Sequence, residues 1–314
     1  MSITHLILEP AERKDIASLI TDAVNEFRSY SWKDRLHHLS LQSCYLPVKL
    51  RKFVKGFQNS IDDDTRLCLI SNFDVSADLK TPIALENNDY SIEDDFLVCT
   101  VASLLGEVFG WQEEQNGRIV HNIVPLKQSE NTQESTGSSQ VIHWHTDEAF
   151  HRYTTDYLAI ACIKNPTQIP TIYCSINSLD LTDNSFDILF ESRFIFKKVD
   201  SHKSNNRDKV VQSVLYGNRS KPFIRIDHYF MEAADYDSRQ ALDKLIEYIS
   251  SSLAEVILRP GDILLIDNAL CVHGRNPFKA SYDGNDRWLK RINITRDLYK
   301  SRDNNNHMTS RLLL

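Results

Sequence analysis

This 314-residue chain contains little glycine and lacks the motifs that mark several large enzyme classes. Its nine glycines form no GxGxxG, Walker A or GxSxG pattern, so the usual signals of dinucleotide, phosphate-loop and nucleophile-elbow chemistry are missing. No apolar run approaches the roughly 18–20 residues of a membrane span. The first residues also lack the basic and apolar regions of a secretory signal. We therefore expect a cytoplasmic protein without a membrane partner.

Cysteines are few, and basic residues are outnumbered by acidic ones. The six cysteines are scattered, and no two have the CxxC spacing of a zinc or redox motif. We interpret them as buried thiols in a reducing compartment rather than as a disulfide or zinc framework. The 36 Lys and Arg residues against 43 Asp and Glu give a net charge of −7, which disfavours a nucleic-acid partner. The hydrophobic content of 41% is typical of a packed core.

Hydrophobic periodicity divides the chain into a helical first part and a strand-rich remainder. It predicts helices over residues 9–30, 47–57 and 93–111. The second is basic and amphipathic, and we interpret it as a core-facing helix rather than a membrane-surface one. One later helix is expected over residues 238–253. Short strands are expected at residues 118–124, 157–163, 171–175, 193–199, 210–215, 223–226, 255–258, 262–266 and 288–295.

This order of elements favours an α+β, mainly β fold. Helices followed by many short strands are typical of a helix-decorated antiparallel sandwich or jelly roll, not of alternating βαβ units. We expect one domain over residues 1–314, in which a helical part (1–112) packs on a core (113–300). The polar stretch 127–140 is a candidate lid. Residues 301–314 are expected to be a mobile tail.

One short segment, His143 to His151 (HWHTDEAFH), carries the chemistry. His145 and Asp147 stand at i and i+2, so on a strand their side chains point to the same side. Two histidines and one carboxylate with open positions are the ligand set of non-haem Fe(II) oxygenases. The pair alone is weak evidence, because in a chain with eleven histidines one or two His-x-Asp or His-x-Glu patterns are expected by chance. A hydrogen-bonded strand histidine, or a zinc-type site that includes His143, remains open.

A third ligand and a candidate anion clamp follow much later in the chain. His273 comes after a strand-like run, and Arg287 stands fourteen residues further on. A guanidinium holds a carboxylate through two hydrogen bonds. The distal carboxylate of a 2-oxoglutarate molecule that chelates iron requires such a partner.

These residues resemble those of a known family. The segment HTDEAFH, followed by Asp156-Tyr157-Leu158, resembles the proximal metal motif of the clavaminate synthase-like 2-oxoglutarate oxygenases. The sequences VHGRNPF (272–278) and YDGNDRWLKR (282–291) are closer still to the distal motif of that family. The resemblance runs from about Gln115 to Arg296, and the family includes hydroxylases of free arginine, asparagine and lysine.

The resemblance implies a fold and a set of cofactors. The fold would be a double-stranded β-helix (jelly roll) core with flanking N-terminal helices and a helical insert. His145, Asp147 and His273 would bind Fe(II), and Arg287, helped by Thr171, would bind 2-oxoglutarate. O2 would be the second cosubstrate. Relatives that act on arginine or asparagine often carry glutamate at the position of Asp147, so the carbon attacked does not carry over. A carboxylate at that position argues against halogenation, because halide needs it vacated.

The resemblance also implies four substrate contacts. Arg291 would face the substrate carboxylate, Gln115 and Ser135 would contact the amino-acid head, and Asp227 would anchor a basic side chain. Each has a structural alternative, because Arg291 and Asp227 could pair internally, while Gln115 and Ser135 could be ordinary loop residues. Thr171 could likewise be an ordinary strand threonine.

We therefore expect an enzyme that hydroxylates C3 or C4 of a free basic L-amino acid. Lysine is favoured over arginine, because Arg225 shares the strand face of Asp227, where a guanidinium substrate would want a second carboxylate. Arginine, another free amino acid or a carrier-tethered amino acid is the alternative substrate. A non-catalytic sensor of 2-oxoglutarate or iron is the alternative from a different class. The expected partner is a small-molecule amino acid, and the sequence is compatible with a homo-oligomer.

Overall fold

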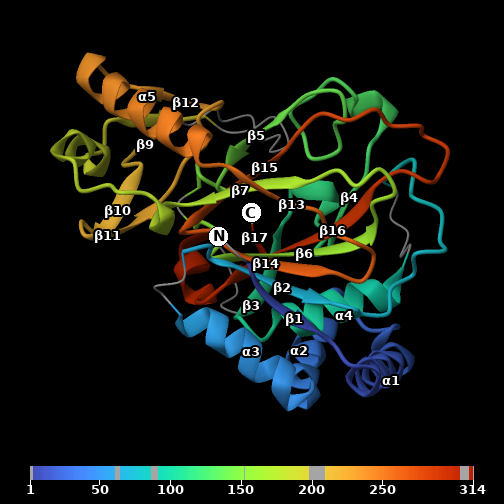
Figure 1. The fold of residues 1–314 in the computed structure, drawn as a ribbon. Coiled ribbons are helices and arrows are strands. Elements are labelled where there is room, and N and C mark those ends of the chain that lie inside the picture. The colour runs from blue at the N-terminus through green and yellow to red at the C-terminus, as the bar shows by residue number, and fades with distance from the viewer. Residues whose placement is uncertain are drawn as a thin grey trace.

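Two β-sheets pack face to face at the centre of the computed structural model, which describes residues 3–60, 64–85, 91–151, 153–197, 209–304 and 311–313 (Figure 1). The smaller sheet has the order β13–β7–β15–β5 and is antiparallel throughout. Its strands are β13 (Ala254–Val256), β7 (Thr171–Ser175), β15 (Cys271–Arg275) and β5 (Ile142–His145).

The larger sheet has the order β1–β2–β14–β6–β16–β3–β17, and β4 also pairs with β16. Only the pairs β1–β2 and β17–β3 are parallel among the described strands. The strands are β1 (Thr4–Ile7), β2 (Leu67–Ser71), β14 (Ile263–Asp267), β6 (Tyr157–Lys164), β16 (Trp288–Thr295), β3 (Glu107–Trp111), β17 (Leu312–Leu313) and β4 (His121–Ile123).

Side-chain alternation on β6 divides the core into two layers. Leu158, Ile160 and Cys162 face the smaller sheet and join Tyr173 and Cys271 in one hydrophobic cluster. The intervening residues of β6 face the opposite way. They pack under four helices, α1 (Pro10–Phe27), α2 (Trp32–Gln42), α3 (Val48–Asn59) and α4 (Ile92–Ala102). These helices therefore cover the outer face of the larger sheet (Figure 1).

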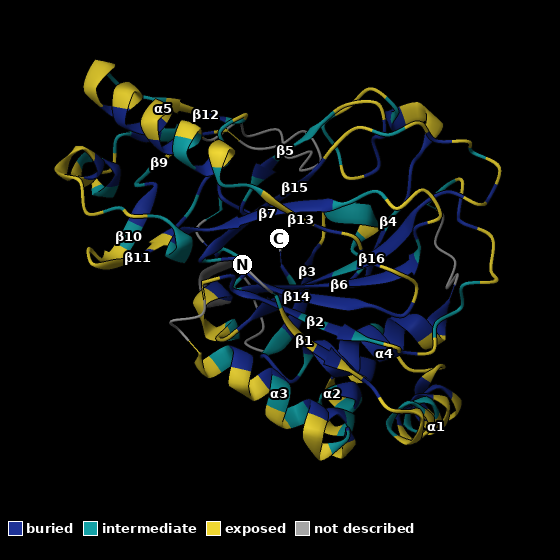
Figure 2. Ribbon diagram, viewed as in Figure 1, coloured by how far each residue is buried: buried dark blue, intermediate teal, exposed yellow. Residues whose placement is uncertain are grey.

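A second layer covers the outer face of the smaller sheet. Helix α5 (Tyr236–Ser251) packs there in a cluster with Trp144 of β5 and Val272 of β15. Two small sheets lie beside it, β12–β8–β9 and β10–β11. Their strands are β8 (Phe194–Phe196), β9 (Val210–Gln212), β10 (Leu215–Asn218), β11 (Lys221–Ile224) and β12 (Met231–Ala233). The central strands are buried on both faces. Helices α1, α2, α3 and α5 expose the face that points away from the sheets, whereas α4 is almost entirely buried (Figure 2).

The structure confirms a mainly β chain with helices first, and it corrects several predicted elements. The helix predicted over 93–111 ends at Ala102, and residues 107–111 form β3 instead. Helix α2 and strands β1 and β2 were not predicted. In the tail that was expected to be mobile, Leu312 and Leu313 pair with β3, while 305–310 and 314 lie outside the described residues. So do residues 198 and 199 of the strand predicted over 193–199.

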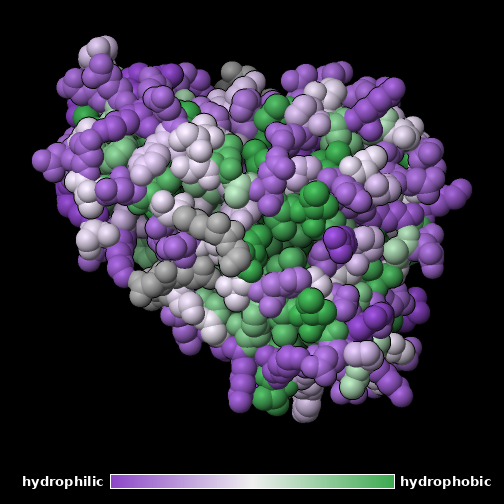
Figure 3. Space-filling view, in the orientation of Figure 1, coloured by the Kyte–Doolittle hydropathy of each residue, from purple (hydrophilic) through white to green (hydrophobic). Residues whose placement is uncertain are grey.

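Five of the six cysteines agree with the prediction of buried thiols. All six cysteines are free thiols and five are buried, but Cys44 is exposed, so the prediction of burial is wrong there. Within the described ranges, no helix is long and apolar enough to cross a membrane. Hydrophilic side chains dominate the face in Figure 3, and apolar side chains gather at its centre, over the edges of the two sheets.

Candidate active site

Two paired strands bring the predicted metal ligands together. Strands β5 and β15 are antiparallel neighbours, and His145 is the direct cross-strand partner of His273. Asp147 follows two residues after His145, and all three ligand atoms lie within 4.8 Å of one another. The Oδ1 atom of Asp147 is 3.1 Å from Nε2 of His145 and 3.3 Å from Nε2 of His273. One oxygen and two imidazole nitrogens thus converge on a single point.

Backbone features next to the ligands hold this arrangement. At Gly274, a Cβ atom would lie 2.6 Å from the carbonyl oxygen of Ile142 and 3.0 Å from the backbone of Trp144. Only glycine allows β15 to approach β5 this closely beside His273. Asn268 is buried and fixes the backbone of Asp147 from both sides. Its side-chain oxygen accepts from the Asp147 N–H at 2.8 Å, and its NH2 group donates to the Asp147 carbonyl at 3.1 Å.

The electrostatics of the three ligands suit a cation. Burial raises the pKa of Asp147, but Arg291, His145 and His273 outweigh burial and hold it well below its usual value. For His145, burial is likewise outweighed by the Asp147 carboxylate, which raises the pKa to about 9. The pKa of His273 is lowered, chiefly by burial. An ionised carboxylate with two imidazoles is the donor set of facial-triad Fe(II) sites, so these residues fit that metal.

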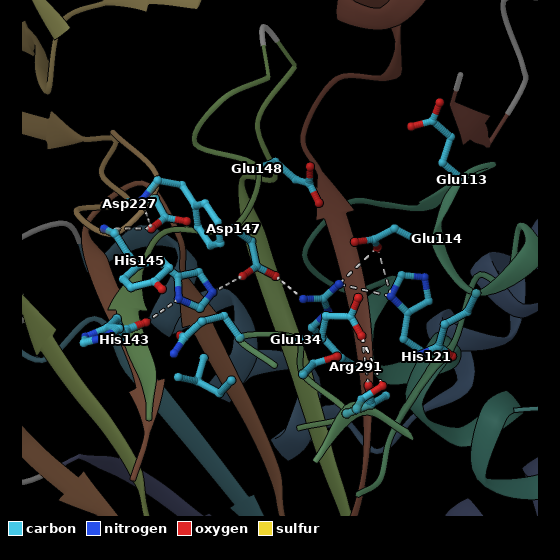
Figure 4. Close-up of a pocket in the computed structure, with 18 of the residues that line it drawn as sticks. Glu113, Glu114, His121, Glu134, His143, His145, Asp147, Glu148, Asp227 and Arg291 are labelled. Atoms are coloured by element: carbon cyan, nitrogen blue, oxygen red, sulfur yellow. Dashed lines mark hydrogen bonds and ion pairs between the residues drawn. The ribbon is translucent and has the colours of Figure 1, made fainter. Parts of the chain in front are cut away.

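A cavity of about 450 Å³ opens beside the triad (Figure 4). Its walls come from residues 113–116, the 127–140 segment, the region that follows β5, residues 227–230 and Arg291. Arg291 is the only Lys or Arg among the described lining residues, whereas six lining residues carry carboxylates: Glu113, Glu114, Glu134, Asp147, Glu148 and Asp227. The cavity is therefore strongly acidic and suited to a cationic ligand.

The predicted substrate residues Gln115, Ser135 and Asp227 all line this cavity. The Gln115 amide is engaged, because it exchanges two hydrogen bonds of 3.0 Å with the backbone of Asn122. Asp227 lies beside His145, with which it forms an isolated β-bridge. Its Oδ1 accepts weakly from two following backbone N–H groups at 3.3 Å. Burial raises the pKa of this carboxyl group.

Arg291 also lines the cavity, but its guanidinium is already paired within the protein. It forms ion pairs with Asp147 at 2.8 Å and with Glu114 at 3.1 Å, and it contacts His121 at 3.1 Å (Figure 4). The internal pairing considered from the sequence is thus present. Sequence reasoning missed Glu114 and His121, and the only available signal was that Glu114 adjoins Gln115.

Arg287 and Thr171, the predicted 2-oxoglutarate contacts, lie outside the lining of this cavity. Arg287 is only 6% exposed, and no described residue forms a hydrogen bond or an ion pair with its guanidinium. Burial lowers its pKa to about 10. Thr171 is buried on β7, opposite Arg275 of β15. A buried cation without a counter-ion among the described residues is what a carboxylate-binding site requires.

A second buried arginine supports the 127–140 segment. Arg275 donates to the carbonyl oxygens of Gly137 at 3.0 Å, Ser138 at 3.3 Å and Gln140 at 3.5 Å. These hydrogen bonds attach the segment to β15, the strand that carries His273. The segment contributes Glu134 and Ser135 to the cavity wall. Whether it acts as a lid stays a prediction.

Comparisons with known proteins show which proteins this chain is similar to. Residues 191–293 match the family described as taurine catabolism dioxygenase TauD, TfdA family. The chain is 37% identical over 291 residues to an L-ornithine/L-arginine 3-hydroxylase of Catenulispora acidiphila, which covers 82% of this chain and 84% of the relative. It is 27% identical to an L-lysine 4-hydroxylase of Flavobacterium johnsoniae, over 88% of this chain and 79% of the relative.

Among solved structures, the fold is similar to that of the non-heme iron oxygenase OrfP in complex with Fe, succinate and (3S)-hydroxy-L-Arg. The TM-score is 0.91 at 33% sequence identity, and the match covers 99% of each chain.

Proposed function

The chain belongs to the TauD/TfdA family, as an amino-acid hydroxylase that depends on Fe(II) and 2-oxoglutarate, and from this premise we propose that its substrate is a free L-amino acid of the arginine type. The proposed reaction replaces a C–H bond at C3 or C4 with C–OH and yields succinate and CO2. The acidic cavity beside the triad carries this proposal. Besides the proposed metal ligand Asp147, five carboxylates line it together with a single arginine, which suits a substrate that carries positive charge on its side chain and its α-amino group.

Arginine is preferred to lysine for two reasons. The expectation of lysine rests on Arg225 sharing the strand face of Asp227. In the structure, however, Arg225 donates to Gln212 and lies over the ring of Tyr216, and it does not line the cavity. The reason to exclude a guanidinium is therefore gone. The relative named for ornithine and arginine is also more similar in sequence than the one named for lysine, at 37% against 27%.

The two facing sheets correspond to the expected core. We assign β13–β7–β15–β5 and the antiparallel strands β2–β14–β6–β16 to the two sheets of a double-stranded β-helix. Their shared hydrophobic cluster and antiparallel pairing support this assignment. The metal ligands then lie on the smaller sheet and at the end of β5.

In the proposed site, His145, Asp147 and His273 hold Fe(II), and Arg287 binds the distal carboxylate of 2-oxoglutarate with the help of Thr171. When bound, Fe(II), 2-oxoglutarate and O2 supply the oxidising chemistry that attacks the substrate C–H bond. The protein orients the reactants and excludes water. Asn268 keeps Asp147 in place through two backbone hydrogen bonds. Residues of the 127–140 segment form one wall of the substrate cavity.

The proposed substrate lies along the acidic wall. Arg291, Gln115 and Ser135 would contact the amino-acid head, and Asp227 would pair with the side-chain cation. The Asp227 carboxylate suits this role because, among the residues that the structure describes, it accepts only two hydrogen bonds, both at 3.3 Å from backbone N–H groups. It also lies next to His145, so a substrate anchored there is held close to the metal ligands.

A product assay tests the proposal. The protein is purified anaerobically, loaded with Fe(II), and supplied with 2-oxoglutarate, O2 and one of arginine, ornithine, lysine or asparagine. Succinate release and mass spectrometry report turnover. We expect a product with one added oxygen atom from arginine or ornithine. Asp227→Asn should lower kcat/KM for arginine far more than Glu247→Gln, a change on the exposed face of α5. Hydroxylation of lysine alone would overturn the choice of arginine, and failure of all four would overturn a free basic substrate.

A further inference from the structure

The two carboxylate oxygens of Asp147 have different partners. Oδ1 faces the two imidazoles, at 3.1 Å from His145 Nε2 and 3.3 Å from His273 Nε2. Oδ2 faces away from them and lies 2.8 Å from a terminal guanidinium nitrogen of Arg291. This second contact is an ion pair rather than an aligned hydrogen bond. In Figure 4, Asp147 accordingly lies between His145 and Arg291. Oδ1 therefore points to the proposed metal position, and Oδ2 is paired with Arg291.

Arg291 is held in this position by two acceptors on its far side. Its other terminal nitrogen donates to Glu114 Oε2 and to His121 Nδ1, both at 3.1 Å. The Nε2 of His121 is 2.9 Å from the carbonyl oxygen of Arg118 and must donate to it, which leaves Nδ1 as an acceptor. Burial lowers the pKa of His121 to about 4 despite the neighbouring Glu114, so the ring is neutral at physiological pH. Glu114 and His121 therefore act together on one terminal NH2 group of Arg291.

This chain of contacts bears on how Asp147 can bind a metal. A carboxylate can offer one oxygen or both to the same ion. An octahedral ion with three protein ligands has three positions left, and 2-oxoglutarate chelation with O2 uses all of them. If Asp147 offered both oxygens, it would occupy one of those positions itself. An arginine fixed on Oδ2 prevents this.

We propose that Glu114 and His121 are positioning residues that hold Arg291 against Oδ2 of Asp147, so that Asp147 binds the metal through Oδ1 alone. This inference rests on the proposed function, because it concerns the iron and 2-oxoglutarate of that same site. It assigns Arg291 a role before any substrate is present. Outer partners of metal ligands commonly tune a site in this way.

The test separates metal binding from cosubstrate binding, without turnover. Co(II) replaces Fe(II) in the full-length protein, and its visible absorption reports coordination number. Titration with 2-oxoglutarate then gives a Kd in the absence of substrate. The variants are Arg291→Met, which removes the clamp, Glu114→Ala, which removes its anchor, and Glu114→Gln, which keeps an acceptor oxygen. Glu247→Gln on α5 is the control, and circular dichroism checks folding.

We expect Arg291→Met and Glu114→Ala to bind Co(II) as tightly as the wild type or more tightly, with an altered absorption spectrum. In both variants, the Kd for 2-oxoglutarate should be at least about tenfold higher than in the wild type. Glu114→Gln should recover most of the wild-type Kd and spectrum. A residue that serves only packing would lower both affinities together, and that pattern in Glu114→Ala would overturn the proposal. So would a wild-type spectrum and a wild-type Kd for 2-oxoglutarate in Arg291→Met.

The wild-type protein separates this inference from the proposed function. If wild-type protein binds neither Co(II) nor 2-oxoglutarate, the proposed function fails and the inference fails with it. If wild-type protein binds both and the variants behave identically to it, the function stands and only the positioning role is refuted.

Discussion

Replacing Arg287 with methionine should have opposite effects on the ligand-free and the ligand-bound protein. Arg287 is 6% exposed, and its guanidinium has no hydrogen bond or ion pair to any described residue. Burial lowers its pKa from 12.5 to about 10, a penalty on the charged form of about 3 kcal/mol. Methionine fills a similar volume without a charge. Arg287→Met should therefore raise the free energy of unfolding of the ligand-free protein by up to about 3 kcal/mol.

The same variant should lose its cosubstrate. Removing one partner of a buried charge pair costs roughly 3–5 kcal/mol, because the other charge remains buried and unpaired. The Kd for 2-oxoglutarate should therefore rise roughly 100- to 4000-fold. Urea unfolding measures the first effect, and anaerobic calorimetric titration of the Co(II) form measures the second. The wild type should gain thermal stability when 2-oxoglutarate is added, and the variant should not.

Arg275 provides a matched control of opposite sign. Burial lowers its pKa to about 10 as well, but its guanidinium donates to three backbone carbonyls of the 127–140 segment. Arg275→Met leaves three carbonyl acceptors without their donor, at roughly 1–3 kcal/mol each. This loss exceeds the roughly 3 kcal/mol that is relieved when the charge is removed, so the ligand-free protein should be destabilised. The reasoning is refuted if Arg287→Met destabilises the protein as Arg275→Met does and leaves the Kd for 2-oxoglutarate unchanged.

Three further outcomes follow from the same contacts. Gly274→Ala should cost about 1–3 kcal/mol of stability in urea unfolding and weaken Co(II) binding, because its Cβ would lie 2.6 Å from the Ile142 carbonyl oxygen. Gly56→Ala is the control: a Cβ added there would have no atom within 4 Å, so the substitution should stabilise α3 by about 0.5–1 kcal/mol. Removal of metal with EDTA should lower the Tm of the wild type, and a similar drop in His273→Ala would argue against the predicted ligand set. The folded-state pKa of His121 is lowered from 6.5 to about 4, so its contribution to stability is complete above pH 6.5 and is lost as pH falls towards 4; between pH 7.5 and 5 the wild type should lose about 2 kcal/mol more than His121→Asn, and equal losses in the two proteins would contradict the assignment.

Local patterns in the sequence predicted the strand-rich half of the chain well. Strands β7 and β16 have the predicted bounds, because β-branched and aromatic residues are concentrated in both. The error at residues 107–111 has a physical reason. Helix α4 is buried on every side, so its apolar character continues without a break into β3. The change to a strand depends on pairing with β16, where a Cβ on Gly106 would lie 2.4 Å from the carbonyl oxygen of Thr295. A short stretch of sequence around Gly106 cannot show this contact, because Thr295 is far away in the chain.

Some residues of the candidate site could be predicted from local sequence patterns, and others could not. His145 and Asp147 were predictable because the two-residue spacing of a strand places them on one side. His273 and Arg287 were candidates because of the residue types that an iron site and a carboxylate clamp need, and the resemblance then gave them their roles. The comparisons confirm the family and its cofactors. The network around Arg291 was not predictable, because Glu114 is 177 residues away in the chain and its position depends on the fold. The argument for lysine over arginine lost its basis for a similar reason, since strand parity could not show that Arg225 turns away from the cavity.

The pairing of His145 with His273 also separates what can vary in this enzyme from what cannot. Strands slip only by whole residues, and a slip of one residue would turn every side chain of β5 to the opposite face. The spacing of the two imidazoles therefore cannot drift by small mutational steps. The cavity walls around residues 113–116, 133–136 and 227–230 lie largely in connections, which tolerate change. Directed evolution of a new substrate range should concentrate on residues 133–136 and 227–230. Glu114 in the first segment is better left unchanged, because it contacts Arg291, which pairs with the predicted metal ligand Asp147.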